Sequence, residues 1–165
     1  MLFWEDSIEK WIKMRDKRFV AIHRGGSLNK EQHSQLIKWA YKCAQHVLPL
    51  LGESIDERLN DALRVAMAWK RGEVSVGAAR NASLEAIAAA NESSNPAAIA
   101  VARAIGHAVA TAHMADHSLK AAEYALKAIK ASGKSIETER KWQDKQIPSN
   151  VKDLVLSARN KSFNK

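Results

Sequence analysis

Cysteine is almost absent from this chain: Cys43 is the only one among 165 residues. A single thiol excludes an internal disulfide and any metal site built from several thiolates. No run approaches the roughly 20 consecutive apolar residues that span a bilayer. The opening residues Met1-Leu2-Phe3-Trp4-Glu5-Asp6 also lack the basic-then-apolar order of a secretory signal. We therefore expect a cytoplasmic protein without membrane contact.

Glycine and proline are also scarce, with seven and three residues, and no segment alternates β-branched with polar residues as a half-buried strand does. Apolar residues instead recur at helical spacing between the few glycines and prolines. The pattern predicts an all-α single domain over residues 1–165, a bundle or array of about seven to eight helices. The expected helices cover about 6–22, 29–48, 54–71, 76–90, 97–115, 118–132, 135–142 and 150–158.

Several expected helix starts carry capping residues. Ser54 and Asp56 can each accept from free backbone N–H groups, and Glu57 completes a capping-box pattern with Ser54. Pro96 suits the first turn of a helix, where its missing N–H costs nothing.

Alanine is the residue that the chain has in excess. Between Val76 and Ser132, 21 of 57 residues are alanine, and isoleucine, leucine and valine recur among them at helical intervals. Small side chains allow helix backbones to approach closely. The helix over 97–115 is therefore predicted to lie centrally and to pack tightly.

Positive charge is concentrated at one end of the sequence. The chain carries a net charge of +8, and residues 119–165 hold eleven Lys and Arg against five Asp and Glu. Such a field attracts nucleic acid or an acidic protein, although a solvated lysine face is the commoner meaning. Only Tyr124, Trp142 and Phe163 are interleaved with these lysines, so a nucleic-acid module is the weaker alternative.

Three of the six histidines fall within the alanine-rich stretch from Ala102 to His117. His113 and His117 are four residues apart, and with Asp116 they resemble a partial metal site, but Met114 stands where a zincin has glutamate. His107 lies roughly 240° around the helix from His113, and it joins the pair only if the helix breaks near Asp116, which would also move His117. Structural, hydrogen-bonded imidazoles are the commoner reading of such a pattern.

Arg103, His107 and Thr111 repeat at four-residue spacing and share a helix face. An arginine in an alanine-rich helix needs compensation, because an unpaired buried charge is costly. We expect an ion pair with Glu85 or Glu73; the sharper alternative is a notch that binds an anion or a partner.

Enzymatic signatures are missing. No Gly-x-Ser-x-Gly elbow occurs, and Arg24-Gly25-Gly26-Ser27 is too short for a phosphate-binding loop and follows a helix. We predict no catalytic residue and no cofactor. Cys43, Trp39, Trp69 and His46 are interpreted as structural.

Three segments carry a resemblance to a known family. They are Leu36 to Leu48 (LIKWAYKCAQHVL), Ala62 to Val74 (ALRVAMAWKRGEV) with Gly77-Ala78-Ala79-Arg80 after it, and the Gly106 to His113 helix with Tyr124 to Ala128 after it. Together they resemble the Imm-5-like family of inferred bacterial immunity proteins over about residues 33–130. The basic helices over 135–160 are less similar to the family.

The resemblance implies an all-α protein that binds and neutralises a cognate toxin in the cytoplasm. Many immunity proteins that block basic nucleases are acidic, so this basic chain does not fit that scheme. The alternative is a metal-binding protein or metal-dependent enzyme that uses the helix with His107, His113 and His117, of which His113 and His117 are the candidate metal ligands. The candidate binding residues are Arg103, His107, Thr111, His113, Asp116 and His117.

Overall fold

The computed structural model describes residues 16–163, which form seven α-helices and no strand. A single isolated bridge joins Ala21 to Leu28. The all-α prediction is therefore confirmed. The helices are α2 (Lys30–Val47), α3 (Glu57–Lys70), α4 (Val76–Asn91), α5 (Pro96–Ala110), α6 (His117–Ala131), α7 (Ile136–Lys145) and α8 (Lys152–Phe163), with 3-10 turns at Lys17–Phe19, Ile22–Arg24, Leu48–Leu51 and Ser149–Val151.

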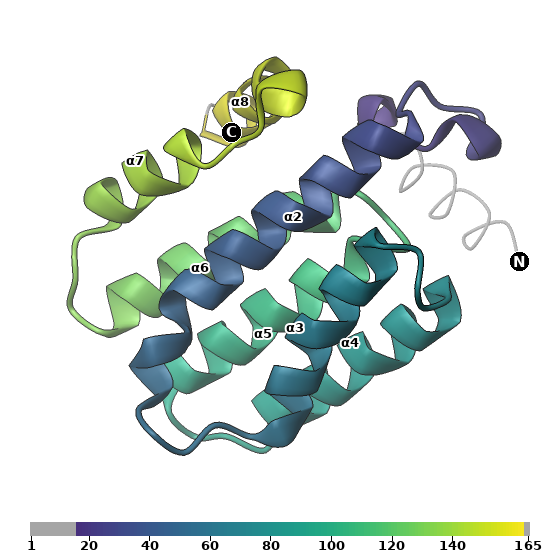
Figure 1. The fold of residues 1–165 in the computed structure, drawn as a ribbon. Helices are drawn as coiled ribbons and strands as arrows, with labels where there is room; N and C mark the ends of the chain where they lie inside the picture. The colour runs from purple at the N-terminus through teal and green to yellow at the C-terminus, as the bar shows by residue number, and fades with distance from the viewer. Residues whose placement is uncertain (1–15, 164–165) are drawn as a thin grey trace, which may run out of the picture.

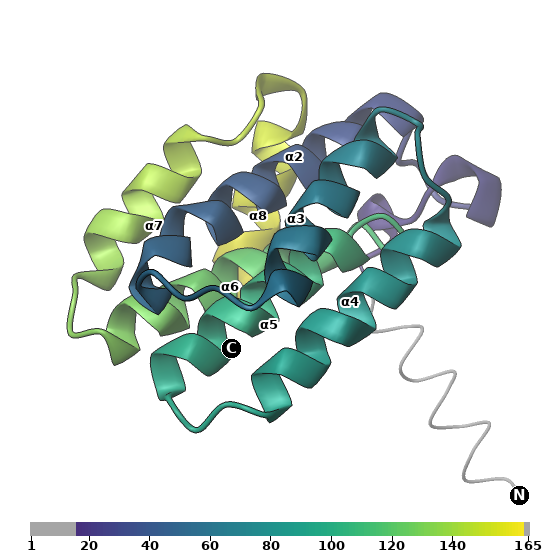
Figure 2. The same ribbon diagram turned by 60° about the horizontal axis from the view of Figure 1, so that its bottom comes forward.

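The alanine-rich helix α5 lies at the centre of the bundle, as predicted. It contacts α2, α3, α4 and α6, and Figure 1 shows these helices arranged around it. In the view of Figure 2, α7 and α8 lie beside α2 and α6, on the side away from α4. The basic C-terminal helices therefore cover one flank of the bundle.

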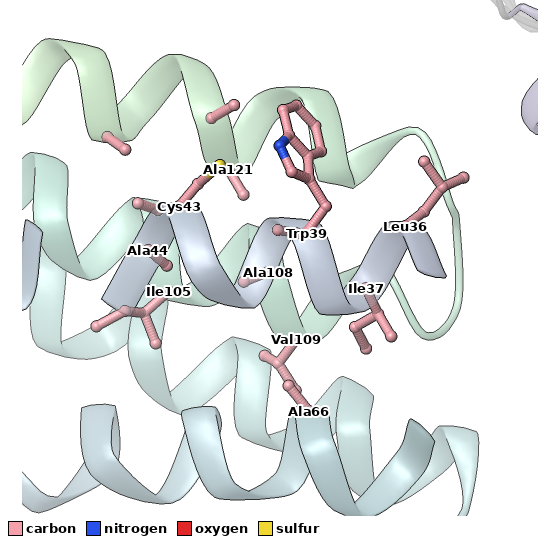
Figure 3. Packing of buried hydrophobic residues seen from close by; sticks show 14 of the residues in the cluster. Leu36, Ile37, Trp39, Cys43, Ala44, Ala66, Ile105, Ala108, Val109 and Ala121 are labelled. Carbon is pink, nitrogen blue, oxygen red and sulfur yellow. The ribbon is translucent and has the colours of Figure 1, made fainter. Parts of the chain in front are cut away.

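Small side chains allow the central helices to approach one another. Ala104, Ala108 and Ala121 have no exposed surface, and they pack with larger residues such as Ile105 and Trp39. Figure 3 shows how these side chains meet between the helices. Gly106 faces α4, where an added Cβ would come into van der Waals contact with Ile87 Cγ1 at 3.4 Å. A central helix of bulkier residues would hold its neighbours further away.

Local capping explains most of the helix starts. Asn29 accepts from the backbone N–H of Gln32, whose side chain accepts from the Asn29 N–H in return. Asn95 caps α5 directly before Pro96. For α3 the cap is Asp56, which accepts from the Arg58 N–H, so the capping box predicted between Ser54 and Glu57 is wrong.

The helix predicted over 6–22 is also wrong where it can be tested. Residues 1–15 lie outside the described residues, but residues 16–22 form no α-helix. Asp16 caps a 3-10 turn through the Arg18 N–H, and the chain then loops through Gly25 and Gly26 so that Ala21 and Leu28 form a parallel bridge. Apolar spacing alone missed this loop.

Helix α5 ends at Ala110, about five residues earlier than predicted. In a longer helix the Thr111 carbonyl would accept from the N–H four residues on. Here the His33 Nε2–H donates to that carbonyl at 2.6 Å. The partner on α2 therefore favours a break in the chain between α5 and α6.

None of the helices described within residues 16–163 has both the length and the apolar character needed to cross a membrane.

Candidate functional site at the α5–α6 corner

The connection between α5 and α6, residues Thr111–Asp116, is the feature that gathers the sequence-predicted residues. We call it the α5–α6 corner. It reverses the chain, so that His117 at the start of α6 returns to His107 near the end of α5. The two Nδ1 atoms lie 2.9 Å apart. A bond between them requires that one ring donates its Nδ1–H while the other presents an unprotonated Nδ1.

Aromatic stacking extends this contact into a histidine–tyrosine cluster of His107, His113, His117 and Tyr124. The His107 ring stacks on Tyr124 with centroids 5.2 Å apart, and the His113 ring stacks on His117 at 5.6 Å. Lys127 Nζ lies 4.5 Å from the centroid of the Tyr124 ring. The cluster thus joins the corner to the exposed side of α6.

His107 is a neutral imidazole at neutral pH. Burial is the largest effect and lowers the pKa of His107 from 6.5 to about 4. Nearby positive charge adds to the shift, from His117 first and then from Lys120, while Asp116 partly opposes it. A neutral His107 fits its role in an imidazole–imidazole hydrogen bond.

The metal interpretation gains no support from the described geometry. Within residues 16–163 no group of three or more His, Cys, Asp or Glu side chains is arranged to hold a metal ion. Catalytic zinc sites use three protein ligands. His113 and His117 stack as rings instead, so the metal site stays a prediction from their spacing.

The face expected for Arg103, His107 and Thr111 runs from solvent into the core. Arg103 is exposed, and its guanidinium lies 5.9 Å from the Tyr124 ring centroid. Thr111 is fully buried, and its hydroxyl donates to the His107 carbonyl. These residues therefore do not form one continuous contact surface.

The ion pair predicted for Arg103 is wrong. Among the described residues Arg103 pairs with no carboxylate, and Glu73 binds Arg71 at 3.0 Å instead. Because Arg103 is exposed, water solvates its charge, and the physical premise of a buried arginine does not apply.

A groove next to the corner was not predicted from the sequence. We call it the end groove, because its lining residues come from where α3 ends, α4 begins and α5 meets α6; these helix ends lie to the right in Figure 1. Its volume is about 520 Å³. It is lined by Phe19, Val20, Ala21, Ile22, His23, Arg24, Leu28, Asn29, Lys30, His33, Trp69, Val76, Ala112, His113, Met114 and Ala115.

The lining of the end groove is apolar with a basic rim. Ten of the sixteen lining residues are apolar, and none is acidic. Arg24 reaches across to the corner, where its Nη1 donates to Met114 Sδ at 3.2 Å. His33 tilts against Trp69 with ring centroids 4.8 Å apart, and burial lowers the pKa of His33. Arg24 and Lys30 therefore carry the positive charge of the rim.

Sequence reasoning missed the groove because its walls come from segments far apart in the chain. The groove forms only in the folded structure, where four separate segments meet: residues 19–30, Trp69, Val76 and the α5–α6 corner. The one local signal was Gly25-Gly26, which lies between the helices predicted over 6–22 and 29–48. His113 is the only candidate site residue that also lines the groove.

Comparison with protein families gives one match. The family described as "Imm-5 like putative immunity protein" matches residues 26–150, which is 125 of the 165 residues. The match includes α2 to α7 and the whole α5–α6 corner. Comparison with curated proteins and with solved structures gives no match.

Proposed function

Because the chain belongs to the Imm-5-like family of immunity proteins, we propose that it binds a cognate bacterial toxin and neutralises it by occluding the toxin's active site or target-binding site. The family match over residues 26–150 is the observation that carries this proposal. The protein acts in the cytoplasm, where it meets the toxin before the toxin reaches its target.

The composition of the end groove supports a role in protein binding. The cores of protein interfaces are enriched in aromatic residues, methionine and arginine. Phe19, Trp69, Met114 and Arg24 line the groove together. The net charge of +8 favours a toxin with an acidic binding surface.

The C-terminal basic residues do not all contribute to a surface field. Arg159 is buried beneath Trp39, whose ring centroid lies 5.4 Å from the guanidinium carbon, and it donates to Asp144 at 2.8 Å. This arginine holds α8 against the bundle. The nucleic-acid alternative therefore stays a prediction from charge alone.

Co-expression with the product of a neighbouring gene that stops cell growth when expressed alone tests the proposal. We expect cells that carry both proteins to grow, and cells that carry the toxin alone to stop growing. The two purified proteins should form a stoichiometric complex in size-exclusion chromatography with light scattering. Absence of both protection and complex formation would refute the immunity function.

A further inference from the structure

We propose that the end groove binds a segment of the toxin that carries both apolar and acidic side chains. Arg24 and Lys30 pair with the carboxylates of this segment. The inference rests on the proposed function for the identity of the partner. It adds the place of contact and the chemistry of the segment that enters.

The first argument is exposed apolar surface in a concave site. Ile22, in the second 3-10 turn, is 60% exposed, and Val76, the first residue of α4, is 42% exposed. Both line the end groove. Removing such apolar surface from water favours association. An apolar segment that fills the groove therefore covers surface that the described fold leaves in water.

The second argument is the charge of the rim. Arg24 forms no ion pair with any carboxylate of the described residues, and its hydrogen-bond acceptor there is the Met114 thioether. A thioether is a weak acceptor, whereas a carboxylate binds a guanidinium through short, charge-assisted hydrogen bonds. Lys30 adds a second exposed positive charge. The groove therefore selects for acidic residues beside the apolar ones.

The third argument is that the outer wall of the groove, residues 19–26, is held in place before binding. Leu28 N–H donates to the Val20 carbonyl, and Ile22 N–H donates to the Leu28 carbonyl, both at 3.0 Å. Gly26 N–H donates to the Ala21 carbonyl at 3.1 Å. A wall ordered in the free protein loses little conformational entropy on binding. The groove is therefore suited to bind a segment without rearranging.

Matched surface substitutions test the contact by calorimetric titration of the full-length protein with the toxin domain. Ile22→Glu should weaken the affinity at least tenfold, whereas Leu84→Glu should change it less than twofold. The two positions are matched, because Leu84 on α4 is 57% exposed and lies outside the groove. Arg24→Glu should likewise weaken binding tenfold, and Lys134→Glu, an equal charge change at an exposed site, should not.

Each variant is first compared with the wild type by circular dichroism and melting temperature, so that unfolding is not mistaken for lost contact. If Ile22→Glu and Arg24→Glu fold and bind the toxin as tightly as the wild type, the groove proposal is overturned while the immunity function stands. If the wild type itself does not bind, both proposals fail together.

Photo-crosslinking identifies the occupant. A benzoylphenylalanine at position 22 should attach to a toxin peptide that contains both apolar and acidic residues, and one at position 84 should not attach to the toxin. Attachment in the complex to a second copy of this chain, or to residues 1–15 of the same chain, would overturn the proposal in favour of that occupant.

Discussion

At the scale of single residues, His107 shows how the corner depends on an uncharged imidazole. Its Nδ1 lies 2.9 Å from that of His117, and its ring stacks on Tyr124. Protonation of both histidines would leave two donors facing each other. The lowered pKa of His107 and the hydrogen-bond geometry therefore both favour an uncharged His107 ring in the folded protein.

Because the folded protein favours an uncharged His107, we predict that it loses stability in acid. The unfolded chain binds a proton at His107 near pH 6.5, whereas the folded protein does so only near pH 4. Protons therefore favour the unfolded state between these values, and the free energy of unfolding falls as the pH falls through this window. Since His107 is only half-buried, we expect it to contribute about 1–2 kcal/mol.

Urea unfolding between pH 7 and pH 4 measures this effect. His107→Gln should flatten the pH dependence of the free energy of unfolding relative to the wild type. His33, whose pKa is also lowered by burial, contributes in the same direction and leaves a residual slope in the His107 variant. Equal slopes for His107→Gln and wild type would contradict the prediction.

A second prediction at this scale concerns buried Gln143. Its side-chain amide donates to the Ala122 carbonyl, and its carbonyl oxygen accepts from Arg159. Gln143→Leu leaves a buried guanidinium with fewer acceptors, so we expect a loss of about 2–4 kcal/mol in the free energy of unfolding. The double variant Gln143→Leu with Arg159→Met should recover part of this loss; an undiminished loss would contradict the network.

At the scale of elements, the sequence was informative where local chemistry decides. The cap at Asp56 and the proline at Pro96 predicted helix starts within a few residues. The end of α5 was not predictable, because the His33 imidazole that binds the Thr111 carbonyl comes from another helix. The pairing of His107 with His117 was not predictable for the same reason. It requires the helix to break between the two histidines, and a residue of another helix favours that break.

The outer wall of the end groove gives a prediction at this scale. A Cβ at Gly26 would lie 2.0 Å from the Val20 carbonyl oxygen, so the turn cannot keep its path in Gly26→Ala. We expect this variant to weaken toxin binding at least tenfold with little change in global stability. Gly77→Ala, whose Cβ meets only Ser75 Oγ at 3.7 Å, is the control and should bind normally.

Helix spacing gives another prediction. Ala121 on α6 has no exposed surface, and extra methylene groups there must push the helices apart. Ala121→Leu should cost about 1–3 kcal/mol in the free energy of unfolding. The same substitution at exposed Ala131, on the same helix, should change stability by less than about 0.5 kcal/mol. Equal effects at the two positions would show that the helices tolerate wider spacing.

At the scale of the whole molecule, the sequence predicted the all-α class and the central α5 but not the end groove. The apolar periodicity of a helix indicates which of its faces is buried. It does not indicate the shape of a cavity that the ends of several helices form together. The groove gathers residues from positions 19 to 115. Only the tertiary arrangement shows that Arg24, Trp69 and Met114 line one site.

Net charge predicts how the complex responds to salt. A chain of charge +8 attracts an acidic partner over a distance of about the Debye length, which shortens as the salt concentration rises. The association rate constant with the toxin domain should therefore fall several-fold between about 0.05 M and 0.5 M sodium chloride. The dissociation rate constant should change much less. Stopped-flow fluorescence measures both rates, and a salt-independent association rate would argue against electrostatic attraction.

The boundary of the family match passes through the end groove. The floor, with His33, Trp69 and the α5–α6 corner, lies within residues 26–150, whereas Ile22 and Arg24 lie before that range. The groove proposed as the contact site is therefore only partly covered by the match, since exposed Ile22 and the rim cation Arg24 precede it. Replacing residues 16–25 would thus alter the proposed contact surface of this chain while leaving every matched helix unchanged.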